Sequence, residues 1–342
     1  MRLGVFVAYW PWFTYDEQVA LARRADRLGY DSVWVAEGYG QEAVAILGAL
    51  SAVTEQIRLG TGILQIPARQ PAAAATAAAT LDRISGGRLL LGLGLSGPQV
   101  SEGWYGVPFT APLRRTREYV EIVRMACSGD RLTYPGREWT IPYEGGLRLG
   151  KPLKMLGGGP IQSRIPIYLG VGGQRTVEQC GEIADGWFPF LFSPEHSAML
   201  TEPLLRGLAR SGRDRSAMTI AAAVPAALHE DLATARDLVR PLLAFYLGGM
   251  GSREKNFYTE LAVRYGHGAS ARECQDRFLA GDRRGAEAAL TPELIDLVTI
   301  AATPTTLEKS VARFAGADVD TLVVVPFGDR PAVLEALAGV LA

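Results

Sequence analysis

The sequence has few cysteines, no long apolar run and almost no net charge, and each absence excludes a class of protein. Its three cysteines lie far apart and form no CxxC pair, so we expect reduced thiols in a cytoplasmic protein. No apolar stretch approaches the roughly 20 residues that cross a bilayer, so no membrane partner is expected. The formal net charge of −1 gives no basis for binding nucleic acid.

Several motifs of common enzymes are also missing. No G-x-S-x-G stretch is present, and the three histidines fall in predicted helices or insertions without metal-ligand spacing, so no metal site is expected. The first predicted strand is followed by AYWPWF instead of a glycine-rich turn, which disfavours a nicotinamide-binding Rossmann fold. Glu37 and Glu102 form a weak candidate pair for glycoside hydrolysis.

What the chain does contain is a repeated alternation of strand and helix. Helical patterns cover residues 15–28, 41–54, 71–84, 111–127, 176–184, 203–211, 232–247 and 332–341. Strands are predicted at residues 2–8, 31–36, 57–64, 88–95, 165–169, 186–190, 219–224 and 321–325. The alternation indicates a parallel sheet, either open and doubly wound or closed, and eight repeats favour an α/β TIM (β/α)8 barrel.

Two segments interrupt the alternation in what we expect to be a single domain spanning residues 1–342. Residues 128–164 are rich in glycine and proline, with a predicted hairpin near 132–141, and residues 248–303 are polar and helical. In a barrel we expect both to rise over the carboxyl ends of the strands, where long insertions form lids or substrate walls.

The carboxyl ends of the predicted strands supply the candidate site residues, because barrel enzymes place their active sites there. The strand IRLGTGIL (57–64) holds Gly60 and Gly62, which mark either the approach of a flat ligand or the relief of crowding inside the barrel. The run GVGGQR (170–175) opens a predicted helix and offers backbone N–H groups and one cation to a phosphate. Aromatic residues follow the first strand at Tyr9, Trp10, Trp12 and Phe13.

Taken together, these stretches resemble the bacterial luciferase-like superfamily, and within it the branch that uses the deazaflavin coenzyme F420 (methylenetetrahydromethanopterin reductase-like proteins). The resemblance is carried by DSVWVAEGYG (31–40), IRLGTGIL (57–64), SGGRLLLGLGLSGPQVSEGWYG (85–106), RTREYVEIVR (115–124), IPIYLGVGG (165–173), EIADGWFPF (182–190) and GGMGSREKNFY (248–258). It implies a TIM barrel with the deazaflavin at the carboxyl rim, commonly in a homodimer, which the Ala-rich helix at 71–84 could support by close packing.

The resemblance also implies which residues meet the coenzyme. A non-prolyl cis peptide is expected between Gly62 and Ile63, as a support for the deazaflavin ring. The phosphate and tail are expected at residues 172–175. The full expected coenzyme set is Thr61, Gly62, Ile63, Gly94, Ser96, Gly172, Gly173, Gln174 and Arg175.

One departure from the family pattern bears on the chemistry. Sugar-phosphate-oxidising relatives carry an Asp-His pair after strand two, where this chain reads Glu37-Gly38. Without a histidine base, reduction of a C=C or C=N bond in a small, mostly apolar substrate is expected over alcohol oxidation. Glu37 is the first expected proton donor and Glu102 the second, although Glu37 also fits a buried acid bonded to backbone N–H groups.

Two other functions remain open at the level of sequence. An FMN-dependent monooxygenase of the same superfamily would use reduced flavin and oxygen. A cofactor-free binding protein that kept the barrel would reduce nothing with either coenzyme.

Overall fold

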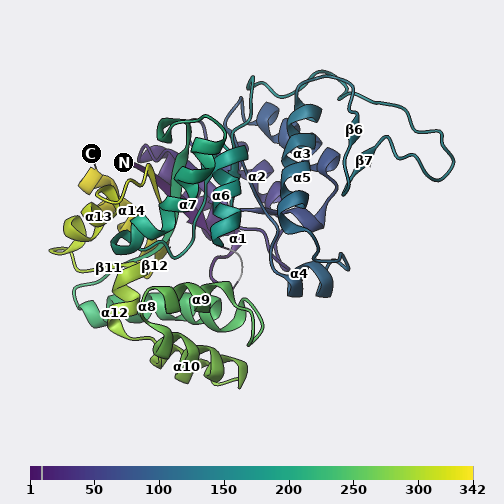
Figure 1. Ribbon diagram of the computed structural model, residues 1–342. Helices are drawn as coiled ribbons and strands as arrows, with labels where there is room; N and C mark the ends of the chain where they lie inside the picture. Colours follow the sequence, from purple (N-terminus) through teal and green to yellow (C-terminus); the bar gives the residue numbers. More distant parts are fainter. Residues whose placement is uncertain (9–10, 342) are drawn as a thin grey trace.

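The computed structural model describes residues 1–8 and 11–341, and its centre is a closed barrel of eight parallel strands (Figure 1). Each strand pairs with the next, and the last pairs back with the first, as in a TIM barrel. The barrel strands are β1 (Arg2–Val7), β2 (Ser32–Val35), β3 (Arg58–Thr61), β5 (Leu89–Gly94), β8 (Ile167–Leu169), β9 (Gly186–Trp187), β10 (Thr219–Leu228) and β12 (Thr321–Phe327). The predicted barrel is confirmed.

Helices surround the barrel, and their ends follow local sequence signals. Thr14 and Glu17 form a capping box at the start of the first helix, and Pro71 opens the third. Four alanines of that third helix, at 74, 75, 78 and 79, are buried within this same chain. The surrounding helices are α1 (Tyr15–Arg27), α2 (Ala43–Ser51), α3 (Pro71–Ile84), α5 (Pro112–Cys127), α6 (Gln174–Ile183), α7 (Ser197–Arg210), α13 (Leu307–Ala315) and α14 (Arg330–Leu341). The helix predicted at 232–247, α8 (Leu232–Ala244), instead lies with the helices of residues 248–303 in Figure 1, and its Leu238 would be 2.9 Å from a Cβ atom on Gly328, just past β12.

Some bounds differ from the sequence prediction. Helix α7 begins six residues before Pro203, which lies inside the helix instead of opening it. Strand β10 continues to Leu228, and a short strand that was not predicted, β11 (Ile300–Ala302), pairs with its far end. Helix α13 was also not predicted.

The third predicted strand is broken at the residues that matter most for the site. β3 ends at Thr61, and the chain resumes pairing with β5 only at β4 (Leu64–Gln65), which leads into the 3-10 turn η1 (Ile66–Ala68). The peptide bond between Gly62 and Ile63 is cis, as the family resemblance implied. At the interruption Gly62 still donates its backbone N–H to the Val35 carbonyl of β2, at 2.7 Å, so the wall continues past the end of β3.

The second insertion lies at the carboxyl end of the barrel, which we call the mouth. After the π-helical turn η4 (Phe245–Gly249) it forms α9 (Phe257–Arg264), α10 (Gly268–Leu279), α11 (Arg283–Ala288) and α12 (Pro292–Val298). In Figure 1, α9 and α10 lie below the barrel, on the same side as the short helix α4 (Pro98–Gly103) that follows β5. This position agrees with the expectation of a wall over the mouth.

The first insertion, residues 128–164, does not lie over the mouth, contrary to expectation, and we call it the arm. Its hairpin of β6 (Tyr134–Pro135) and β7 (Thr140–Ile141) donates three backbone N–H groups to the Glu118 carboxylate on α5. Arg83, near the end of α3, donates hydrogen bonds to the carbonyl groups of Gly157, Gly158 and Gly159. The arm leaves the amino end of the barrel because it follows a helix, and it projects sideways in Figure 1.

Among residues 1–8 and 11–341, no helix is both long and apolar enough to cross a membrane.

Candidate active site

A cavity of about 700 Å³ opens at the mouth of the barrel. Its walls are mostly apolar and aromatic, and much of the surface comes from glycine backbone. The lining includes residues 36–39, 62–63, 95–100, 170–173, 187–190, 249–251 and 257–258. Its size and position are those of a small-molecule site in a barrel enzyme.

Gly62 and Ile63 form part of the cavity wall, and neighbouring glycines make room for them. A Cβ atom on Gly94 would lie 2.7 Å from Ile63 Cδ1, and one on Gly170 would lie 2.9 Å from Ile63 Cγ2. Gly60 is likewise needed for Trp34, because a Cβ there would lie 2.3 Å from the indole. Relief of crowding therefore explains Gly60 and Gly94. It applies to Gly62 as well, because a Cβ there would lie 2.6 Å from the Phe6 ring, although Gly62 also lines the cavity.

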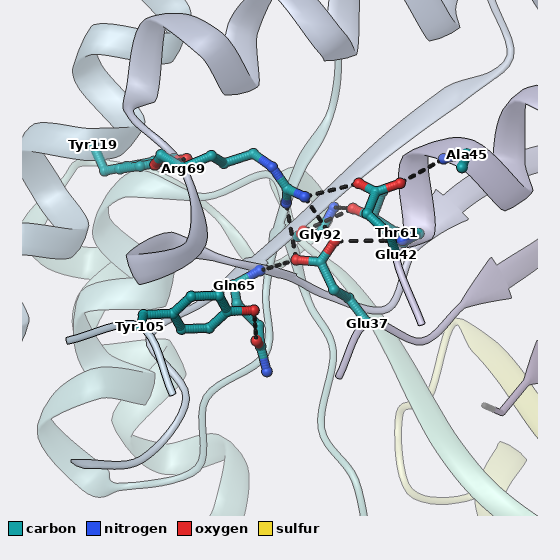
Figure 2. A network of polar contacts seen from close by, with 10 residues as sticks. Glu37, Glu42, Ala45, Thr61, Gln65, Arg69, Gly92, Tyr105 and Tyr119 are labelled. Atoms are coloured by element: carbon teal, nitrogen blue, oxygen red, sulfur yellow. Dashed lines mark hydrogen bonds and ion pairs between the residues drawn. The ribbon is translucent and has the colours of Figure 1, made fainter. Parts of the chain in front are cut away.

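Glu37 borders the cavity, but its carboxylate is fully engaged (Figure 2). Arg69 binds both oxygens at 2.9 Å, and the backbone N–H groups of Gln65 and Ala43 donate at 2.9 and 3.4 Å. A carboxylate offers about four lone-pair positions, and these donors use all of them. These contacts are those of a buried acid bonded to backbone N–H groups, and they leave no lone pair toward the cavity, so the geometry does not support the expected role of Glu37 as a proton donor.

Arg69 links Glu37 to a wider polar network that the sequence did not reveal. It also binds the Glu42 carboxylate at 2.8 Å, and its backbone carbonyl accepts the Tyr119 hydroxyl. Burial alone would lower the pKa of Arg69, but hydrogen bonding and charge from Glu37 outweigh it and raise the pKa. Because 32 residues separate Glu37 from Arg69 in the chain, no local motif marks this pair.

Gln65 is the other buried polar residue of this wall. Its side-chain Oε1 accepts a hydrogen bond of 2.7 Å from the Tyr105 hydroxyl, and its side chain borders the cavity. The sequence places Gln65 at the end of the third predicted strand, but neither Gln65 nor Tyr105 was predicted to have a role. The sequence signal that could have marked Gln65 is its position, two residues past Ile63 on the strand where pairing with β5 resumes.

Glu102 is not brought into the cavity. It lies exposed on α4, where its carboxylate accepts the backbone N–H of Phe109 at 3.0 Å. The cavity lining includes its neighbour Gly103 but not Glu102. Its prediction as a second proton donor therefore has no geometric support.

The predicted coenzyme residues fall into two groups. Gly62, Ile63, Ser96, Gly172 and Gly173 line the cavity, and Ser96 has a left-handed backbone with φ of 58°.

The other predicted residues lie outside the lining. Thr61 is buried, and its hydroxyl both donates to the carbonyl of Gly92 at 2.7 Å and accepts its N–H at 2.8 Å. Gly94 lies behind Ile63. Gln174 and Arg175 are exposed on the first turn of α6.

The glycine loop after β8 lies beside a ring of the second insertion. Gly173 caps α6, so the free N–H groups of this helix start next to the cavity. The Phe257 ring occupies the position of a side chain on Gly172, since a Cβ there would lie 1.8 Å from the ring.

Arg175 points to a second, separate cavity of about 460 Å³ on the outside of the barrel, between α5, α6 and α7. Arg114, Arg117 and Arg210 line it as well, together with Glu178 and Glu182. Arg117 pairs with Glu182, and Arg210 pairs with Glu178. This cavity is therefore basic but partly neutralised.

Few charged groups reach the mouth cavity. Apart from Glu37, the lining of the described chain includes Lys255 and Glu260, both exposed, and no histidine. Residues 1–8 and 11–341 contain no group of three metal-ligating side chains. Of the aromatic residues predicted after strand one, Tyr9 and Trp10 lie outside the described residues. Trp12 packs on Phe245 and Phe13 on Phe327, away from the lining.

A closed parallel barrel with an apolar cavity at its carboxyl mouth defines a TIM-barrel enzyme. The family model of the luciferase-like monooxygenases matches residues 1–321, so the chain belongs to this family of oxidoreductases.

Individual proteins agree with the family. A protein of Mycobacterium tuberculosis, provisionally named coenzyme F420-dependent oxidoreductase, is 39% identical over 329 residues, 95% of this chain and 94% of that protein. The 5,10-methylenetetrahydromethanopterin reductase of Archaeoglobus fulgidus is 29% identical over 94% of this chain and 92% of its own. The solved structure of coenzyme F420-dependent tetrahydromethanopterin reductase from Methanopyrus kandleri superimposes with a TM-score of 0.83 and 22% identity. It covers 98% of this chain and 97% of that one, and this likeness shows the fold.

Proposed function

We propose that this protein is a coenzyme F420-dependent oxidoreductase acting on a small, mostly apolar organic substrate. The observation that carries the proposal is the mouth cavity itself, an apolar chamber with Gly62 and Ile63 on one wall and a free helix N-terminus on another. The name of the relative at 39% identity supports F420 as the coenzyme.

The residues of the cavity fit a deazaflavin with a phosphate on its side chain. Gly62, Ile63 and Ser96 offer backbone and one aliphatic side chain to a flat ring, with Thr61 and Gly94 fixing them from behind. Gly172 and Gly173 place the N–H groups of α6 where a phosphate could accept them. Gln174 and Arg175 lie on the same helical turn, outside the cavity, where the coenzyme's acidic tail would leave it. When bound, the deazaflavin supplies the hydride at C5.

We further propose reduction of a C=C or C=N bond over oxidation of an alcohol. Alcohol oxidation needs a base with a free lone pair near the substrate. The carboxylate of Glu37 has its lone pairs occupied by Arg69 and two N–H groups, and no histidine occurs in the described lining. We therefore assign Glu37 a positioning role and expect the proton to come from solvent.

Binding of the two candidate coenzymes tests the proposal. We expect purified protein to quench the fluorescence of F420 with a micromolar or lower dissociation constant, and to oxidise reduced F420 with an enone or cyclic imine without oxygen uptake. Micromolar binding of FMN with no binding of F420 would establish the alternative, an FMN-dependent monooxygenase. A protein that binds neither and reduces nothing would be a cofactor-free binding protein.

We also propose that the protein is a homodimer of the cytoplasm. Exposed apolar residues of the arm support an interface between copies of this chain. The unpaired state of Cys127, Cys180 and Cys274 supports a reducing compartment.

A further inference from the structure

Gln65 is held so that one end of its amide faces the mouth cavity. The residue is 7% exposed, and this remaining surface borders the cavity. Its neighbours fix it at two points, because Glu37 accepts its backbone N–H at 2.9 Å and Tyr105 donates to its Oε1 at 2.7 Å. Within the described chain, no residue accepts a hydrogen bond from its Nε2. In Figure 2 this atom points away from the Glu37–Arg69 pair.

The geometry of this network makes the amide a fixed donor. Burial, and secondly the charge of Glu37, raise the pKa of Tyr105, so its hydroxyl keeps its proton and donates to Oε1. With Oε1 committed, the Nε2 group of the same amide is left as the donor on the cavity side. Glu37 is the other buried charged or amide side chain of the described lining, and it has no capacity left for a ligand.

We propose that Gln65 is a substrate-binding residue that donates a hydrogen bond from Nε2 to the carbonyl oxygen of an α,β-unsaturated carbonyl substrate. Tyr105, Glu37 and Arg69 act through it as positioning residues. This assignment rests on the proposed function, because it takes the reduced deazaflavin as the hydride source. It narrows the substrate class from any activated C=C or C=N bond to one conjugated with a carbonyl group.

The proposed reduction has two steps, hydride addition and then protonation. A hydride adds to the β-carbon of the substrate, and the C=C electron pair moves toward the carbonyl oxygen to give an enolate. Nε2–H stabilises the charge that develops on this oxygen, as a neutral donor that keeps its own proton. Water then supplies the proton to the α-carbon, which completes a two-electron reduction of the substrate.

A coenzyme-free measurement tests the hydrogen bond by itself. We take 2-cyclohexenone as the probe and record the infrared carbonyl band of the ligand bound to wild-type protein and to Gln65→Met, which keeps side-chain length and removes the donor. We expect a lower band frequency in the wild type than in Gln65→Met. Tyr105→Phe, which frees the amide to rotate, should give an intermediate or broadened band. Gln56→Met, on an exposed residue before β3, is the matched control and should behave as wild type.

The second test measures the kinetics of the reaction with reduced F420. Removing one oxyanion donor from an enzyme costs about 100-fold in rate, so we expect Gln65→Met to lose about that factor in kcat with 2-cyclohexenone. The dissociation constant of F420 should not change, because the amide binds the substrate and not the coenzyme's own carbonyl groups.

Two results would overturn the proposal. One is a carbonyl band that is the same in wild type and Gln65→Met. The other is a loss of F420 affinity in Gln65→Met, which would mean that the amide serves the coenzyme. If the protein bound FMN in place of F420, the proposed function would fail, yet the infrared comparison would still decide the role of Gln65.

Discussion

The side chain of Ile63 fills the space that a Cβ atom on Gly94 would need, with 2.7 Å between that Cβ and Ile63 Cδ1. β4 pairs with β5 at this point, so neither backbone can retreat without breaking the barrel wall. The shape of the cavity wall therefore depends on a glycine in the neighbouring strand.

We expect Gly94→Ala to destabilise the protein by about 1–3 kcal/mol, the usual cost of adding a methyl group to a filled interior. Urea unfolding measures the change. Gly48→Ala is the control, because Gly48 lies inside α2 with nothing within 4 Å of an added Cβ, and it should stabilise by about 0.5–1 kcal/mol. Equal effects of the two substitutions would contradict the packing argument.

The Glu37–Arg69 pair predicts a strong coupling between two substitutions. Arg69→Met leaves a buried carboxylate without its cation and should cost about 3–5 kcal/mol, while Glu37→Gln with Arg69→Met should cost less than Arg69→Met alone. Because we assign Glu37 a positioning role, Glu37→Gln, which keeps an oxygen to accept the Gln65 N–H, should lose less turnover with reduced F420 than Gln65→Met. A complete loss of turnover in a folded Glu37→Gln variant would restore the donor role.

Arg175 offers a test of where the coenzyme's acidic tail runs. The side chain is exposed, so Arg175→Ala should change stability by less than about 0.5 kcal/mol. It should weaken binding of F420, and more so at low salt, without changing the affinity for the deazaflavin fragment that lacks phosphate and tail. Arg23→Ala, on an exposed position of α1, is the control and should alter neither affinity. If Arg175→Ala weakened the binding of both ligands equally, Arg175 would not act on the phosphate and tail of the coenzyme.

Asp26 predicts a specific pH dependence of stability. Its carboxylate accepts the backbone N–H groups of Glu55, Gln56 and Ile57 at 2.8, 3.0 and 2.7 Å, which fixes the entry to β3. Burial alone would raise the pKa of Asp26, but these three donors outweigh it and lower the pKa below the ordinary 3.8.

A lowered native pKa means that this stabilisation is complete above pH 3.8 and is lost as the pH falls through the native value. Asp26→Asn should therefore be less stable than wild type by about 2 kcal/mol at pH 7, and the difference should shrink below about pH 4. Urea unfolding at a series of pH values checks this, and a difference that is constant down to pH 2 would contradict it.

The exposed apolar residues of the arm predict that the protein is a dimer. Leu147 and Leu149 are 86% and 81% exposed, and Tyr143, Leu153 and Leu156 add further exposed apolar surface to the same segment. We expect a dimer in sedimentation experiments, and a monomer with unchanged circular dichroism after Leu147→Asp with Leu149→Asp. Leu205→Asp on α7 is the control. A wild-type monomer would show that the arm serves another purpose.

Much of the barrel could be predicted because its signals are local. Residues 71–84 form α3 with the predicted bounds, since Pro71 and the glycines after residue 84 mark its ends. The arm was misplaced although it follows the predicted helix at 111–127, an order that already puts it at the amino end of the barrel. Its contacts with Glu118 and Arg83 could not be read from the sequence.

The candidate site was predicted only in part, for a similar reason. Gly62, Ile63, Ser96, Gly172 and Gly173 lie at or near strand ends, were expected from that position together with the family resemblance, and line the cavity. The hydrogen bonds of the Glu37 carboxylate could not be predicted, because its main partner, Arg69, is 32 residues away in the chain. Those partners decide what role the carboxylate can take. Gln65 was given no role, because its contact with the Tyr105 hydroxyl joins residues 40 positions apart and cannot be read from the sequence.

The contact between Phe257 and Gly172 makes the residue types at two distant positions of the chain depend on each other. A methyl group at position 172 and a ring at position 257 exclude each other, since the Cβ would lie 1.8 Å from the ring. A relative with a larger residue at the first position must therefore carry a smaller one at the second, or hold its second insertion farther from the mouth. Paired substitutions at these two sites offer a way to widen the entrance while the barrel itself stays as it is.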